Sequence, residues 1–321
     1  MKLVKSLTLA AAVLGLVITA GAKAPEKKGP QKLDHAAELR AKLESRDRTY
    51  VFVTMHRGDW RNAPENSSAA ILGSIEKGAD IVELDVAKTK DGHFVLLHDG
   101  ALDRVSNGKG KSTELTLAEI QQYRLKDDKG NVTEYPILSL EEAFALTKGR
   151  ILVNLDKFWR DPKGVLKVAK KCGVEREIVL KDNASVKEAK KKYSTDFWAD
   201  MAKGELFYMP IISTDRKNAV EHFREWRSVG AKCGAYEIIF DKESENWKTV
   251  MEELREVQKV NGPRIWINTL WSSLCAGHTD DRGAKGDAAG SWQWCLDQGA
   301  TMLQTDRPVE LIRYLKSVNR R

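Results

Sequence analysis

Two carboxylates stand two residues apart within an apolar run of the sequence. Residues 81–86 read Ile-Val-Glu-Leu-Asp-Val, so a strand here places Glu83 and Asp85 on one face and Leu84 and Val86 on the other. Two such carboxylates inside a globular protein repel each other and resist desolvation, and a cation between them is the simplest explanation. Hard divalent ions prefer carboxylate oxygens. The pattern therefore predicts a site for one divalent cation, Mg2+ or Ca2+.

Two histidines also stand at the ends of apolar runs near this pair. His56 follows residues 51–55, and His98 follows residues 94–97. One imidazole of such a pair can accept a proton while its protonated partner donates one. Arg57 adds a planar guanidinium that suits two oxygens of a phosphate. Together these residues predict metal-assisted phosphoryl transfer with His56 and His98 as acid and base.

The elements that must position these residues alternate along the chain from about residue 50 onward. Apolar runs alternate with helical patterns, which favours a parallel sheet with crossover helices. The expected strands are 51–55, 80–86 with an extension at 94–98, 150–156, 177–181, 206–212, 235–240, 264–268 and 301–305. The expected helices are 67–77, 139–147, 163–172, 185–202, 217–229, 244–260, 287–298 and 308–318. Eight of each fits an α/β fold of the TIM (β/α)8 barrel type, in which functional residues gather at the carboxyl ends of the strands.

Several short motifs follow one another in order from about residue 50 onward. They are His56-Arg57-Gly58, Pro64-Glu65-Asn66, the run Gly78 to Val86, Thr89, Asp91-Gly92, His98-Asp99, Leu102-Asp103-Arg104, Asn107-Gly108-Lys109-Gly110 and the run Gln304 to Pro308. In order and spacing these motifs resemble the glycerophosphodiester phosphodiesterase family. The resemblance covers the chain from about residue 50 to its end, and its first half is highly specific. The family has the TIM-barrel fold, and the resemblance implies a small insertion after the second strand, at about residues 99–138.

The resemblance implies further site residues around the predicted cation. Asp156, at the end of the third predicted strand, matches the position of a third carboxylate ligand, and Asn154 shares its face. We expect Asn154 to ligate the metal or to support a ligand. Glu65 borders the metal site by resemblance, although a helix-capping role would also explain Glu65 beside Pro64.

The lysine that contacts phosphate is where this sequence departs from the family. The family carries a lysine two residues after the third ligand, whereas here Lys157 follows Asp156 directly and Phe158 takes the expected position. Strand alternation would turn Lys157 away from the face that carries Asp156. Lys181, at the end of the next strand, could supply the missing phosphate-binding cation, or could be an ordinary surface lysine beside Asp182.

The resemblance implies hydrolysis of glycerophosphodiesters to an alcohol and glycerol 3-phosphate. Two alternatives stay open. The chain could act on another lipid-derived or sugar phosphodiester, or it could be a barrel that binds phosphate without catalysis. The small-molecule phosphodiester is the expected partner. The charge of +7, from 53 basic and 46 acidic residues that are well mixed, argues against nucleic-acid binding, and nothing implies a protein partner.

The N-terminus carries the pattern of a secretory signal peptide. Lys2 and Lys5 precede an apolar stretch, residues 7–18, that is too short to span a bilayer well, and Ala20-Gly21-Ala22 fits a cleavage site. We therefore expect a signal peptide at 1–22, a lead-in with a cap helix at 23–46 and the barrel at 47–321. The mature protein would be periplasmic or secreted, without stable membrane insertion. Export permits disulfides, and the pairing of Cys172, Cys233, Cys275 and Cys295 stays open between free thiols and one Cys275–Cys295 bond.

Overall fold

The computed structural model describes residues 34–229, 233–259 and 262–321. The predicted signal peptide at 1–22 and the lead-in at 23–33 lie outside the described residues. Among the residues described, no helix is both long enough and apolar enough to cross a membrane.

Eight parallel strands close into a barrel. Their hydrogen-bonded order is β1-β11-β10-β9-β8-β7-β6-β2, and pairing of β1 with β2 completes the ring. The strands are β1 (Phe52–Met55), β2 (Ile81–Lys88), β6 (Leu152–Asp156), β7 (Ile178–Asp182), β8 (Phe207–Ser213), β9 (Ala235–Ile239), β10 (Arg264–Asn268) and β11 (Met302–Thr305). The predicted TIM barrel is therefore confirmed.

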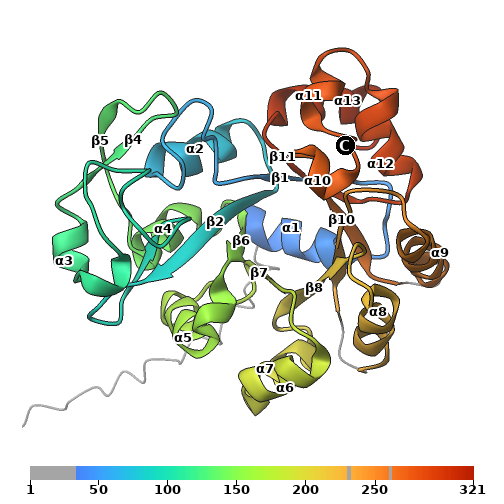
Figure 1. Ribbon diagram of the computed structural model, residues 1–321, viewed down its shortest axis with the longest axis horizontal. Helices are drawn as coiled ribbons and strands as arrows, with labels where there is room; N and C mark the ends of the chain where they lie inside the picture. The colour runs from blue at the N-terminus through green and yellow to red at the C-terminus, as the bar shows by residue number, and fades with distance from the viewer. Residues whose placement is uncertain (1–33, 230–232, 260–261) are drawn as a thin grey trace, which may run out of the picture. The chain divides into compact units, whose positions relative to one another are not determined.

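Helices lie between successive strands and cover the outside of the barrel (Figure 1). They are α2 (Ser68–Glu76), α4 (Leu140–Thr147), α5 (Pro162–Cys172), α6 (Val186–Lys192), α7 (Thr195–Lys203), α8 (Ala219–Ser228), α9 (Glu245–Lys259), α10 (Ser272–Cys275), α11 (Asp280–Ala284), α12 (Trp294–Asp297) and α13 (Pro308–Ser317). A 3-10 turn, η2 (Phe158–Arg160), follows β6, and a π-helical turn, η3 (Ala289–Gln293), precedes α12.

Two expected elements differ in the structure. The single helix expected at 185–202 is two helices, α6 and α7, because the Ser194 hydroxyl caps a new helix by accepting from the Phe197 N–H at 3.2 Å. The expected extension at 94–98 is a separate strand, β3 (Phe94–Leu96), which runs antiparallel to the end of β2. A turn between Lys88 and Phe94 reverses the chain there, so β3 lies outside the ring of parallel strands.

The strand alternation predicted for β2 explains how the barrel interior is built. Val82 and Leu84 pack in the apolar layer shared with the outer helices, whereas Ile81 belongs to a second apolar cluster. That cluster joins residues of seven other strands to the helix α1 (His35–Glu44), and its strand members are Phe52, Ile81, Leu152, Val179, Phe207, Met209, Ala235, Trp266 and Met302. Glu83 and Asp85, two and four residues after Ile81, share its side of the strand. The polar pair therefore points inward, above the apolar cluster.

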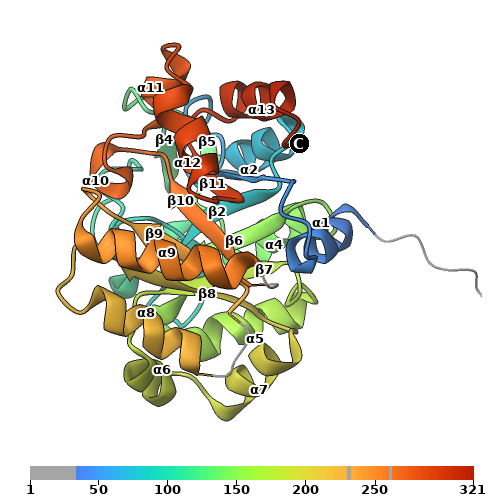
Figure 2. The same ribbon diagram turned by 90° about the vertical axis from the view of Figure 1, so that its right-hand side faces the viewer.

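Helix α1 closes the amino-terminal end of the barrel. Figure 2 shows α1 on the opposite side of the molecule from α10, which follows the carboxyl end of β10. Its apolar side chains Ala36, Leu39 and Leu43 join the inner cluster. The fully buried Arg264, at the start of β10, donates to the carbonyls of Leu43 at 2.8 Å and of Lys42 at 2.7 Å. These bonds satisfy the last carbonyls of the helix, which have no partner within it.

Replacement of Arg264 with methionine is expected to lower the free energy of unfolding by at least about 3 kcal/mol. The change removes the bonds that Arg264 donates to the carbonyls of Leu43 and of Asp47, whereas the Lys42 carbonyl still accepts from Ser45. Bonds from a charged donor contribute about 1.5–3 kcal/mol each. Urea unfolding followed by circular dichroism measures the difference. Arg46→Met, at an exposed position near the same helix end, is the control and is expected to change stability little. Equal losses in the two variants would contradict a closing role for Arg264.

Residues 99–138 form a small unit beside the barrel rather than another strand and helix. They hold η1 (Ser112–Glu114), α3 (Leu117–Ile120) and the antiparallel pair β4 (Arg124–Lys126) and β5 (Val132–Pro136), seen at the edge of Figure 1. Leu102, Val105, Ile120, Leu125 and Ile137 form its own apolar cluster with residues of β2 and β3. This unit is the predicted insertion after the second strand.

All four cysteines are free thiols in this structure. Cys275 and Cys295 are buried, and burial raises the pKa of Cys275 to about 12. Of the two states left open by the sequence, the structure therefore has the free thiols.

Candidate active site

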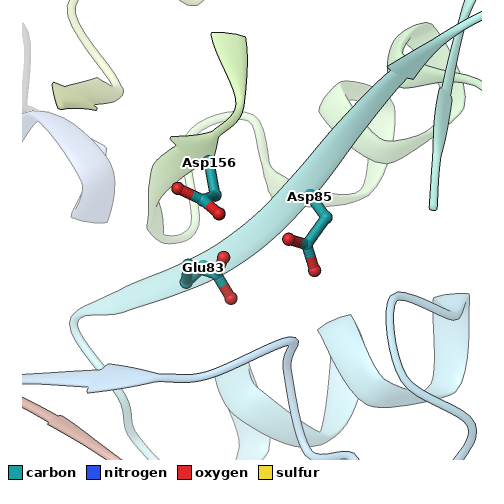
Figure 3. Close-up of side chains that lie close together, drawn as sticks. All are labelled: Glu83, Asp85 and Asp156. Carbon is teal, nitrogen blue, oxygen red and sulfur yellow. The ribbon is translucent and has the colours of Figure 1, made fainter. Parts of the chain in front are cut away.

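The three predicted metal ligands converge where the middle of β2 pairs with the carboxyl end of β6. The two strands are neighbours, and Asp85 of β2 pairs directly with Asp156 of β6 while Glu83 pairs with Asn154. One carboxylate oxygen from each of Glu83, Asp85 and Asp156 lies within 4.8 Å of the others. Figure 3 shows the three carboxylates turned toward a common space.

The electrostatics of this cluster are those of negative charges held close together under burial. Burial raises the pKa of Glu83 well above its usual range, and the charges of Asp85 and Asp156 raise it further. Burial also acts to raise the pKa of Asp85, but Lys157 and His98 outweigh it and the pKa is lowered. A cation in this space would relieve the repulsion that acts on Glu83.

The residues present fit a hard divalent cation. Three carboxylates supply the oxygen ligands that Mg2+ and Ca2+ prefer. Asn154 is fully buried beside Glu83, and its Nδ2 donates to the Val179 carbonyl at 2.9 Å while its Oδ1 has no hydrogen-bond partner. This buried oxygen without a hydrogen bond could ligate a bound ion, or accept a hydrogen bond from a water on that ion.

A tight loop after β1 holds the carboxylates in place. The backbone N–H of Arg57 donates to Glu83 Oε2 at 2.7 Å. Asn66 Nδ2 donates to Asp85 Oδ2 at 3.0 Å, and Asn66 Oδ1 accepts from the backbone N–H of Asp85 at 3.0 Å. Arg57 and Asn66 both have positive φ, 52° and 61°. Such conformations cost non-glycine residues free energy and are concentrated at functional sites. The strain here is matched by the bonds that fix Glu83 and Asp85.

Each predicted catalytic histidine is anchored by a carboxylate at its Nδ1. His56 Nδ1 lies 3.0 Å from Asp306 Oδ1, and the same oxygen accepts from Trp60 Nε1 at 2.6 Å. His98 Nδ1 lies 2.6 Å from Asp99 Oδ1. A carboxylate at Nδ1 favours the tautomer with its proton there, which leaves Nε2 available to accept a proton. The two imidazoles therefore have matching supports from different parts of the chain.

A chain of ion pairs joins the phosphate-binding candidate to the second histidine. Arg57 Nη1 donates to Glu65 Oε2 at 3.0 Å, and Arg104 donates to both oxygens of Glu65 at 2.8 Å. Arg104 also donates to Asp99 at 2.6 Å, and this bond is the main cause that lowers the pKa of Asp99 to about 2. Glu65 thus lies beside the site, but it contacts the two arginines rather than capping the helix. Ser67 caps α2 instead.

The structure places the two lysines differently from the expectation. Lys157 adopts a left-handed backbone conformation, with φ 62°, directly after β6 ends. The strand alternation therefore no longer applies, and the Lys157 ammonium donates to Asp85 Oδ1 at 2.6 Å and to the His98 carbonyl at 2.7 Å. Lys181 is buried, 3.1 Å from Glu237 Oε2. The prediction that Lys157 turns away from the carboxylates is therefore wrong, and so is the alternative that Lys181 is a surface lysine.

Several partners of the site residues carry no role that the sequence motifs predict. Asp306, Asp99 and Arg104 all belong to motifs that were recognised, and Asp306 follows the end of β11, where functional residues of a barrel gather. That position could have identified it. Glu237 on β9 has the same signal, a carboxylate within a buried strand. No sequence pattern marks Trp60 as a donor to Asp306.

Comparisons with known proteins agree with this geometry. A glycerophosphodiester phosphodiesterase of Caldanaerobacter subterraneus subsp. tengcongensis is 51% identical over 72 residues, which are 22% of this chain and 30% of that protein. Such relatives carry the name of the family that the motifs of this chain resemble. A family described as a domain of unknown function matches residues 208–315. The 72 residues that match the Caldanaerobacter protein are less than a third of that protein's length.

Solved structures of glycerophosphodiester phosphodiesterases share the fold over most of their length. One from Parabacteroides distasonis superposes with a TM-score of 0.69 at 23% identity, covering 89% of this chain and 93% of that one. An Oleispira antarctica phosphodiesterase, in complex with the product sn-glycerol-3-phosphate, superposes with a TM-score of 0.58 at 18% identity, covering 83% of this chain and 96% of that one. At these identities the likeness shows the barrel fold.

Proposed function

We propose that this protein is a metal-dependent glycerophosphodiester phosphodiesterase, which hydrolyses its substrate to an alcohol and glycerol 3-phosphate. One observation carries the proposal. Two imidazoles, each held at Nδ1 by a carboxylate, stand at strand ends around a cluster of three carboxylates that includes Asp85. The family of the sequence relatives supports the reaction class, and the product in the Oleispira antarctica structure supports the class of substrate.

In the proposed reaction the two histidines move the protons. The Nε2 atom of one imidazole accepts the proton of a glycerol hydroxyl as that hydroxyl attacks phosphorus, and the other imidazole protonates the departing alcohol. The two then exchange roles when water opens the cyclic phosphate to glycerol 3-phosphate. An internal hydroxyl has a large proximity advantage over bulk water. Asp306 and Asp99 stabilise the imidazolium that forms on His56 and His98.

The cation would be held by Glu83, Asp85 and Asp156, with Asn154 beside them. When bound, it supplies positive charge to a phosphate oxygen and lowers the pKa of a nearby hydroxyl. Arg57 presents its guanidinium to the phosphate, and its Nε, which lies 3.8 Å from Asp85 Oδ2 as an ion pair, makes no hydrogen bond in this structure. Lys157 takes the phosphate-binding role that the sequence predicts for Lys181, since its ammonium lies on the Asp85 side of the cluster.

The direct test is the release of glycerol 3-phosphate from glycerophosphocholine by the purified protein. We expect release that stops with chelator and returns with Mg2+ or Ca2+. A parallel panel of inositol-type and sphingo-type phosphodiesters identifies a different substrate, if one is preferred. A folded protein that binds phosphate but hydrolyses none of these esters would contradict the proposal.

Lys157→Met is expected to lower kcat/KM by about 10–100-fold, which corresponds to the loss of one or two charge-assisted hydrogen bonds to phosphate. Inhibition by glycerol 3-phosphate should weaken by a similar factor. Steady-state kinetics of this variant beside Lys181→Met measures both effects. Because Lys181 is paired with Glu237, its variant should instead lose thermal stability. Weaker inhibition in Lys181→Met alone would return the phosphate-binding role to Lys181.

We also propose that the protein is exported and loses residues 1–22. The support is the sequence pattern of Lys2 and Lys5, an apolar stretch and the small residues Ala20-Gly21-Ala22. Determination of the N-terminal residue of the protein purified from the periplasm or medium should give Lys23. An intact N-terminus in the cytoplasmic fraction would contradict export.

A further inference from the structure

A buried carboxylate that the proposed reaction does not use lies behind the support of His56. Asp280, at the start of α11, is 1% exposed. Its Oδ1 accepts from Thr269 Oγ1 at 2.7 Å and from Trp292 Nε1 at 2.9 Å. Its Oδ2 accepts from the backbone N–H of Asp306 at 2.8 Å. Asp280 therefore connects the segment after β10 to the residue that follows β11.

The last of these contacts leads directly to a candidate catalytic group. Asp306 Oδ1 lies 3.0 Å from His56 Nδ1. The backbone position of Asp306 sets the point from which its carboxylate reaches the imidazole. Asp280 accepts from the backbone N–H of Asp306, and Asp306 contacts the ring of His56, so two contacts connect Asp280 to that ring. On the other side, Trp60 fixes the same Asp306 oxygen.

The surrounding segment is packed so that Asp280 is kept in place. The Asp280 N–H donates to the Thr269 carbonyl at 2.7 Å, and Ser291 Oγ donates to the Thr279 carbonyl at 2.6 Å. Trp292 lies in the π-helical turn η3, a rare conformation that is often found at functional sites. A Cβ at Gly283 would lie 2.9 Å from the Trp292 ring, so only glycine allows the ring to sit where it meets Asp280.

A carboxylate at this position is unfavourable without a reason for it. Burial raises the pKa of Asp280 to about 7, although the bonds from Trp292, Thr269 and Asp306 act to lower it. A threonine or asparagine would carry less desolvation penalty but could not accept three hydrogen bonds equally well. The three hydrogen bonds that the Asp280 carboxylate accepts offset this cost.

We propose that Asp280 is a positioning residue for catalysis, which fixes Asp306 so that the Asp306 carboxylate holds His56 in the tautomer protonated at Nδ1. The inference rests on the proposed function, because that function gives His56 its catalytic role. The group that Asp280 holds is the backbone N–H of Asp306, and Trp292 and Thr269 orient the Asp280 carboxylate toward it.

Asp280→Asn tests the proposal in the full-length protein. An amide places an NH2 group against one of three donors, so at least one of the bonds is lost. We expect kcat for glycerophosphocholine to fall by about 10–100-fold, as for other residues that support a catalytic group from behind, while KM changes little. Imidazole 15N NMR, with the His56 signal assigned from His56→Ala, should show a mixture of tautomers in place of the Nδ1-protonated form.

Asp80→Asn is the matched control at the other end of the barrel. Asp80 is also a 1% exposed carboxylate that accepts a backbone N–H, from Val53 at 2.8 Å, and side-chain donors, Tyr50 Oη at 2.6 Å and the Arg321 guanidinium. It should lose stability but keep kcat and the His56 tautomer. If Asp280→Asn does not fold, Trp292→Phe removes one donor to Asp280 and should show a smaller change of the same kind.

Three outcomes would overturn the proposal. They are a kcat for Asp280→Asn within about twofold of the unmodified protein, an equal loss in Asp80→Asn, or an unchanged His56 tautomer. The NMR result also separates this inference from the proposed function. One pair of results tells them apart: the unmodified protein hydrolyses no glycerophosphodiester, while the Asp280→Asn variant still loses the Nδ1-protonated His56 tautomer. That pair of results would refute the proposed function and support the positioning role of Asp280.

Discussion

Alanine in place of His56 or of His98 is expected to lower kcat for glycerophosphodiester hydrolysis by about 100- to 10,000-fold, the usual contribution of a general acid or base. In the proposed reaction each imidazole transfers one proton, and no other histidine with a carboxylate at its Nδ1 stands at a neighbouring strand end among the described residues. KM should change less than kcat, because Arg57 and Lys157 still bind the phosphate. Initial rates at saturating substrate measure the effect.

His93→Ala is the control for the histidine variants. His93 is exposed in the turn between β2 and β3, so its loss should leave kcat unchanged. The double variant His56→Ala, His98→Ala should be little slower than either single variant, since residues that act as one unit are strongly non-additive. Retention of more than about a tenth of kcat in either single variant would contradict acid–base catalysis by this pair.

Removal of the divalent cation is expected to abolish turnover, and replacement of Asp85 or Asp156 by asparagine to weaken cation binding at least tenfold, as a rough figure for the loss of one charged ligand. The buried carboxylates repel one another, and burial with that repulsion already raises the pKa of Glu83. Titration calorimetry with Mg2+ and with Ca2+ measures binding independently of activity.

Asp182→Asn is the matched control for cation binding. Asp182 is also a buried carboxylate at a strand end, but Lys192 at 2.9 Å and the Tyr193 hydroxyl already satisfy it. Its replacement should leave the affinity for the cation unchanged. Equal weakening in Asp182→Asn and Asp156→Asn, or full activity after complete chelation, would refute the proposed metal site.

The inward pair on β2 shows what could be predicted from sequence and why. Glu83 and Asp85 alternate with apolar residues in a regular strand, and the period of two fixes their face without knowledge of the rest of the chain. The same rule failed one residue beyond β6, where the strand had ended and the left-handed backbone of Lys157 turned its ammonium toward Asp85. Local periodicity is informative only while the regular element continues.

The supports of the site were harder to predict because they depend on long-range contacts. The Trp60 Nε1 that donates to Asp306 Oδ1 is 246 residues away from it in sequence. The Lys157 ammonium and the His98 carbonyl that accepts from it are 59 residues apart. Each of these contacts joins residues from different elements, so neither composition nor spacing reveals them.

During folding, the carboxylate cluster and the His56–Asp306 contact can form at different times, because only the second requires the barrel to close. Glu83 and Asp156 lie on adjacent strands that are closer in sequence than β1 and β11, so their cluster can assemble once β2 and β6 pair. His56 and Asp306 are 250 residues apart, at the ends of β1 and β11. Contacts of such long sequence separation carry a high entropic cost and form late in folding. A partly folded chain could thus bind a cation before its seam has closed, and turnover would begin only when the first and last strands meet.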